Sequence, residues 1–161
     1  MTGFGKSSLL AAFFLAAFPA AQLAKAAEPP ADLCTLLSAA DVGRIVGKPY
    51  KAPESSVAPR PYANTNAGTD CSYSPSGAGD ELMFRAYVDN SPAQATELHA
   101  KLKMFYSPAT PVPGVGDEAY FDPEHAIHVR KGKVRYYLNL GDDAAVEKPL
   151  KELASLVAGK L

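Results

Sequence analysis

The chain has 161 residues, of which 16 are Lys or Arg and 17 are Asp or Glu, so its formal net charge is −1. This length predicts a single domain, and the near-neutral charge excludes a general polyanion binder. The two cysteines are too few for a cysteine-rich zinc or iron–sulfur module. We therefore expect no cofactor and no nucleic acid among the partners.

Residues 1–26 have the pattern of a secretory signal peptide. A lysine precedes the apolar run 9–18, a proline ends that run, and Ala24-Lys25-Ala26 fits the small-x-small cleavage motif. The run is shorter than a membrane-spanning helix requires. Cleavage after this motif leaves residues 27–161, with 14 basic and 17 acidic residues and a net charge of −3. The sequence thus predicts a periplasmic or secreted protein with no stable membrane insertion after cleavage.

Export gives the two cysteines a simple interpretation. In an oxidising compartment an isolated pair most often forms a disulfide. Neither Cys34 nor Cys71 belongs to a C-x-x-C motif or has a basic neighbour that would lower its thiol pKa. We therefore expect a structural Cys34–Cys71 disulfide rather than a redox or nucleophilic thiol. It would close over the proline-containing stretch 51–69, which has almost no periodic apolar residues and is predicted to be a long irregular loop.

Helices and strands alternate along the exported part. Ser38 and Asp41 form a capping box for a short helix that ends at Gly47. Strands are expected over 71–74 and 82–89, the second with clean apolar–polar alternation. A Ser-Pro cap then opens a helix over 91–106, with Phe105 on its buried side. The proline- and glycine-rich stretch 107–116 is predicted to be a loop.

The C-terminal part adds three strands and a helix. The strands are expected over 118–121, 125–130 and 133–140, and the helix begins near Pro149. Lys131-Gly132 is a plausible two-residue hairpin turn, which would place Val129 opposite Val134. Interleaved helices and antiparallel strands predict an α+β domain, in which three helices pack on one face of an antiparallel sheet.

The other face of the predicted sheet collects basic and aromatic side chains. Our candidates for ligand or partner binding are Arg85, Tyr87, His128, Arg130, Arg135 and Tyr137. Like charges that face each other across a hairpin repel, and an anionic or aromatic partner would relieve the repulsion. The alternative is a solvated face whose cations pair with acids from elsewhere. If this face binds an anionic partner, changing Arg130 and Arg135 to serine should weaken that binding and leave the melting temperature nearly unchanged.

The sequence contains no established catalytic motif. G-x-S-x-G, H-E-x-x-H, a P-loop and a dinucleotide fingerprint are all missing. One cluster resembles a metal or hydrolytic site: Asp122, Glu124, His125 and His128. On a strand, however, positions i and i+3 point to opposite faces. We therefore assign no catalytic residue and no metal ligand, and keep a hydrolase with an unrecognised site near these four residues as an alternative.

Two motifs resemble those of a known family. They are Val112-Pro113-Gly114-Val115-Gly116-Asp117-Glu118-Ala119-Tyr120 and the opening Leu33-Cys34-Thr35-Leu36-Leu37-Ser38-Ala39-Ala40-Asp41-Val42, with a second Cys and Tyr73 in the next strand. The family consists of small secreted proteins and lipoproteins of unknown function, best known from actinobacterial envelopes. It is similar to the extracellular sensor domain of a mycobacterial serine/threonine kinase and, more distantly, to the PsbP-like α/β/α sandwich.

The resemblance covers about residues 33–158 and implies an envelope domain that binds something, with no activity to carry over. The lipoprotein members have a lipobox that this chain lacks, so no membrane tether is implied. We expect a non-enzymatic binding or accessory domain of the cell envelope, whose partner is a protein or an envelope glycan. A third possibility, besides the hydrolase, is a secreted inhibitor of another protein. Its contacts would be Pro59-Arg60-Pro61 or Thr110-Pro111.

Overall fold

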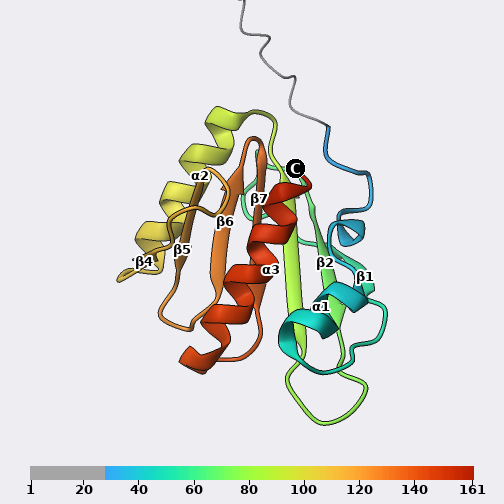
Figure 1. The fold of residues 1–161 in the computed structure, drawn as a ribbon. Coiled ribbons are helices and arrows are strands. Elements are labelled where there is room, and N and C mark those ends of the chain that lie inside the picture. Colours follow the sequence, from blue (N-terminus) through green and yellow to red (C-terminus); the bar gives the residue numbers. More distant parts are fainter. Residues whose placement is uncertain (1–27) are drawn as a thin grey trace, which may run out of the picture.

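The computed structural model describes residues 28–161 (Figure 1), so the predicted signal peptide lies outside the described residues. Seven strands form one antiparallel sheet in the order β1-β2-β3-β7-β6-β5-β4. The predicted α+β class is confirmed. The elements are η1 (Leu33–Leu36), α1 (Ala39–Val46), β1 (Glu54–Ala58), β2 (Gly68–Tyr73), β3 (Leu82–Val88), α2 (Pro92–Phe105), β4 (Thr110–Pro111), β5 (Glu118–Phe121), β6 (Ile127–Lys131), β7 (Val134–Asn139), η2 (Ala144–Val146) and α3 (Glu147–Gly159).

The helices lie on both faces of the sheet, and the expectation that they cover one face is wrong. Helices α1 and α3 lie on one face, and α2 lies on the other (Figure 1). The Tyr136 hydroxyl of β7 donates to the Ala154 carbonyl of α3 at 2.7 Å. Tyr120 of β5 points to the opposite face of the sheet, where the centre of its ring lies 4.9 Å from that of His99 in α2. Strands β5 to β7 thus bury side chains on both sides.

Local sequence signals set the helix ends. The Ser38 and Ser91 hydroxyls accept hydrogen bonds from the backbone N–H groups of Asp41 and Gln94, each at 3.1 Å, which confirms both predicted N-caps. Gly47 ends α1 with a φ of 84°, a conformation that costs glycine little. Phe105, expected to be buried, is 80% exposed at the end of α2.

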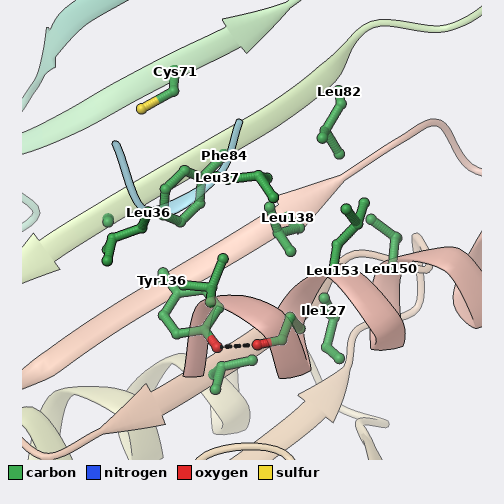
Figure 2. Close-up of a cluster of buried hydrophobic side chains, with 14 of the residues drawn as sticks. Leu36, Leu37, Cys71, Leu82, Phe84, Ile127, Tyr136, Leu138, Leu150 and Leu153 are labelled. Carbon is green, nitrogen blue, oxygen red and sulfur yellow. Dashed lines mark hydrogen bonds between the residues drawn. The ribbon is translucent and has the colours of Figure 1, made fainter. Parts of the chain in front are cut away.

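The main core lies between the sheet and the layer formed by η1, α1 and α3 (Figure 2). Its fully buried side chains come from both layers and include Leu37, Val42, Phe84, Leu138 and Leu153. Truncating one such leucine to alanine typically costs about 2–5 kcal/mol, because transfer free energy is lost and a cavity remains. This core therefore fixes how α1 and α3 sit on the sheet.

The predicted loop over 51–69 contains an edge strand. Strand β1 pairs with β2, and Ser55 lies opposite Cys71. The strand had no periodic apolar signal because four of its five residues are exposed to solvent. The same pairing extends β2 back to Gly68, beyond the strand predicted over 71–74. The irregular part of this region is therefore shorter than expected.

The hairpin between β6 and β7 turns one residue later than predicted. Gly132 and Lys133 form the turn, so Val129 pairs with Tyr136 rather than with Val134. Gly132 has a φ of 56°, and its N–H donates to the Asp117 carboxylate at 2.7 Å. Asp117 precedes the hairpin in the sequence, so the hairpin residues alone do not indicate this hydrogen bond or the position of the turn. From Ile127 onward the side chains still share the predicted faces, but His125 and Ala126, expected in the strand, lie in the turn before it.

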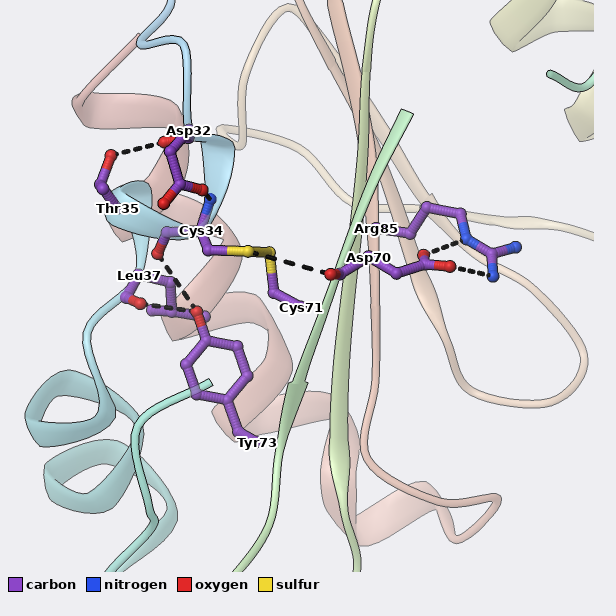
Figure 3. The surroundings of a disulfide bond; sticks show 8 residues. All are labelled: Asp32, Cys34, Thr35, Leu37, Asp70, Cys71, Tyr73 and Arg85. Atoms are coloured by element: carbon purple, nitrogen blue, oxygen red, sulfur yellow. Dashed lines mark hydrogen bonds and ion pairs between the residues drawn. A yellow bond between two sulfur atoms is a disulfide. The ribbon is translucent and has the colours of Figure 1, made fainter. Parts of the chain in front are cut away.

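The predicted Cys34–Cys71 disulfide is present, and it ties η1 to β2 (Figure 3). The Tyr73 hydroxyl, two residues along β2, donates to the Leu37 carbonyl at 2.6 Å and adds a second tie. The two cysteines are 37 positions apart and are both buried. Within residues 28–161, no helix is long and apolar enough to cross a membrane.

Candidate functional site

The six predicted binding residues do share one sheet face. Tyr137 of β7 pairs with Arg85 of β3 and with His128 of β6, and Arg135 likewise pairs with Tyr87 and Arg130. Helix α2 covers part of this face. His128 is only 7% exposed and Arg135 only 3%. The face is therefore less accessible than the sequence suggested.

Each arginine on this face has its own carboxylate partner. Arg85 forms a two-pronged ion pair with Asp70 (Figure 3), with Nη2 to Oδ2 at 2.8 Å. The hydrogen bond with Asp70 raises the pKa of the Arg85 guanidinium above its usual value. Arg130 pairs with Asp117 at 3.0 Å. This arrangement matches the alternative in which acids from elsewhere neutralise the cations.

Arg135 and Asp89 form the most buried of these pairs. Nη2 of Arg135 donates to Oδ1 of Asp89 at 3.0 Å, and the side chains are 3% and 1% exposed. Removing one member of a buried ion pair leaves the other charged and unpaired. The structure therefore reverses the expectation that Arg130→Ser and Arg135→Ser together leave thermal stability nearly unchanged.

A row of stacked rings crosses the same face beneath α2. The His128 ring lies between Tyr120 at 4.9 Å and Tyr137 at 5.4 Å, at interplanar angles of 9° and 23°. Its Nε2 bonds to Oδ2 of Asp122 at 2.8 Å. Burial alone would raise the pKa of Asp122, but the His128 hydrogen bond and two backbone N–H donors lower it. These rings and charges fill the face with mutual contacts.

The four residues of the predicted hydrolytic cluster do not converge. His125 sits in the turn before β6 at a φ of 62°, and its Nδ1 bonds to Oε1 of Glu147 in α3 at 2.8 Å. His128 faces α2 and bonds to Asp122 instead, and Glu124 contributes only its backbone N–H to Asp122. No Ser, Thr or Cys side chain in the described part of the chain bonds to either ring. Residues 28–161 also hold no group of three potential metal ligands.

His99 is a buried histidine that the sequence does not single out as such. It is 1% exposed on the inner side of α2, and its Nε2 has no partner among residues 28–161. Burial lowers its pKa from 6.5 to about 4, because a charged ring would lose its hydration. The nearby Glu118 opposes this shift, whereas the neighbouring Arg130 and Arg135 add to it.

We expect His99→Leu to remove part of the protein's acid sensitivity. Between pH 6.5 and about 4 the unfolded chain binds a proton on His99 that the folded protein does not bind. Wild-type stability should therefore fall by up to about 3 kcal/mol over this window as the pH drops. Urea unfolding at pH 7.5 and 4.5 measures how much stability each protein loses between the two pH values. The carboxylates titrate in both proteins, so the difference between the two losses belongs to His99. An equal loss of stability in the wild type and the variant would mean that His99 does not contribute to the acid sensitivity.

A groove between α1 and α3 was not predicted from the sequence. It is largely open to solvent, has a volume of about 790 Å³, and its apolar lining is Ile45, Phe121 and Leu156. Phe121 is 6% exposed and belongs to the core, and Ile45 and Leu156 are partly buried against that core. The sequence shows that these residues are apolar, but not that the two helices leave a gap above them.

The rim of this groove carries cations that lack partners. Lys148 and Lys151 of α3 are exposed and line the groove, and neither forms a hydrogen bond or ion pair within the described part of the chain. Arg44 lines it from α1, is 64% exposed and, unlike the lysines, forms an ion pair with Asp41 at 3.5 Å. Of the two acids in the lining, Glu147 bonds to His125, and Glu152 is exposed. This cationic rim contrasts with the neutralised sheet face.

No protein-family model, curated protein or solved structure matches the chain. The resemblance to small secreted proteins and to a kinase sensor domain therefore stays a prediction.

Proposed function

We propose that the chain is an exported, non-enzymatic binding domain of the cell envelope, periplasmic or secreted, and that it binds its partner in the groove between α1 and α3. One observation carries the choice of surface. Lys148 and Lys151 stand without partners beside the partly buried apolar side chains of Ile45 and Leu156, whereas the arginines of the sheet face are paired with carboxylates. Concave, largely apolar surfaces with a few polar groups are the usual form of ligand sites.

Two further observations support export. The disulfide between Cys34 and Cys71 suits an oxidising compartment. The sequence of residues 1–26 has the pattern of a signal peptide. The hydrolase alternative has less support, because His125 and His128 lie against different helices and bond to different carboxylates.

Retention of an envelope component on the immobilised protein tests the proposal. We expect the wild type to retain a component that a Lys148→Glu/Lys151→Glu variant loses. A matched control is Lys48→Glu/Lys51→Glu, which reverses two cations outside the groove. If the groove variant retains the component as well as the wild type does, the groove is not the binding surface. Loss on Arg60→Glu instead would favour the inhibitor alternative, whose contact is Pro59-Arg60-Pro61.

A further inference from the structure

The lining of the groove divides into two chemically different parts. Ile45 of α1, Phe121 of β5 and Leu156 of α3 are its apolar part, and all three are packed against or belong to the core. Lys148 and Lys151 are three positions apart on α3, so their side chains lie on the same side of the helix along one edge of the groove. A ligand that matches both parts needs an apolar body and a negative end.

Three classes of ligand fit this groove poorly. An inorganic anion would leave the apolar part uncovered, and exposed cations alone bind anions weakly in water. A cationic or neutral amphiphile would leave both lysines without partners. A docked helix needs a stripe of anchors over several turns, but the apolar part consists of only three side chains. The groove volume of about 790 Å³ instead lies within the range of small-molecule sites.

Resting on the proposed function, we infer that the groove binds one free single-chain amphiphile with an anionic head, such as a carboxylate, sulfate or phosphate. The alkyl chain lies on Ile45, Phe121 and Leu156. The head lies between Lys148 and Lys151, with Arg44 facing it from α1. Two acids, Glu147 and Glu152, also line the groove, and Glu147 is bonded to His125.

Calorimetric titration of the protein with sodium laurate at pH 8, below its micelle concentration, tests this inference. Each methylene that leaves water strengthens binding roughly two- to fourfold in a groove of this kind. Octanoate, four methylenes shorter, should therefore bind at least about tenfold more weakly. Dodecyltrimethylammonium, with the same chain and a positive head, should show no saturable binding. Acetate and inorganic phosphate should not bind either.

Variants locate the binding. Lys148→Glu/Lys151→Glu should weaken laurate binding at least tenfold, and Leu156→Ser should weaken it while far-ultraviolet circular dichroism stays unchanged. The control Lys48→Glu/Lys51→Glu should bind as the wild type does. Equal binding of laurate and dodecyltrimethylammonium, or unchanged affinity in the Lys148/Lys151 variant, overturns the inference. Binding of the protein to laurate-free anionic vesicles without binding of free laurate also overturns it.

Failure here can be told apart from failure of the proposed function. If laurate does not bind but the Lys148→Glu/Lys151→Glu variant loses the retained envelope component, the groove binds another chemical class and only the amphiphile inference is wrong. If the component is retained by that variant, the groove itself is wrong as the binding surface.

Discussion

Replacing Arg135 with serine should lower the free energy of unfolding by about 3–5 kcal/mol. The guanidinium and the Asp89 carboxylate are 3% and 1% exposed, so the substitution leaves a buried negative charge without its partner. Arg135 also lies over the ring of Tyr87, with Cζ 5.4 Å from the ring centroid, and this contact is lost too. Urea unfolding at pH 7 measures the change.

Two controls separate burial from charge. Arg130→Ser removes a cation from the same hairpin, but its partner Asp117 is 35% exposed and keeps Lys131 at 3.2 Å. That variant should cost about 1 kcal/mol or less. Adding Asp89→Asn to Arg135→Ser should restore part of the stability, because the buried charge is removed. If Arg135→Ser costs no more than Arg130→Ser, the buried pair does not stabilise the fold as argued.

Replacing both Cys34 and Cys71 with alanine should lower the free energy of unfolding by about 4 kcal/mol. The crosslink closes a 37-residue separation that includes the exposed edge strand β1, so it removes much of the unfolded chain's freedom. Guanidinium unfolding of the oxidised wild type and the variant measures this difference. Reduced wild type should match the variant, and the variant should not respond to reductant. A difference below about 1 kcal/mol would contradict the role assigned to the crosslink.

Features set by local chemistry could be predicted from the sequence. The N-caps Ser38 and Ser91 act on backbone groups three residues away, so a short stretch of sequence contains both partners. Alternation in strand β3 likewise places Phe84 in the core and Arg85 on the other face. Because the chain has only two cysteines and a predicted signal peptide, the disulfide could also be predicted.

Features that depend on distant partners could not be predicted. Asp70, Asp89 and Asp117 neutralise arginines 15, 46 and 13 positions away, and no periodicity reveals such pairs. Strand β1 is recognisable only through its pairing with β2, because most of its side chains face water. The groove arises from the spacing of α1 and α3 on the shared core. The basic face was thus predictable from the sequence, but its neutralisation by distant acids and the groove between α1 and α3 were not.

The most direct test of the groove as the binding surface is a map of backbone amide shifts in ¹H–¹⁵N spectra as sodium laurate is added to the purified protein. We predict saturable shifts clustered along α1 and α3, around Ile45, Lys148, Lys151 and Leu156, and at Phe121 of β5. The spectra should change little around Arg85, Tyr87 and Tyr137. Shifts centred on those three residues, or changes spread without saturation over the whole domain, would contradict the account.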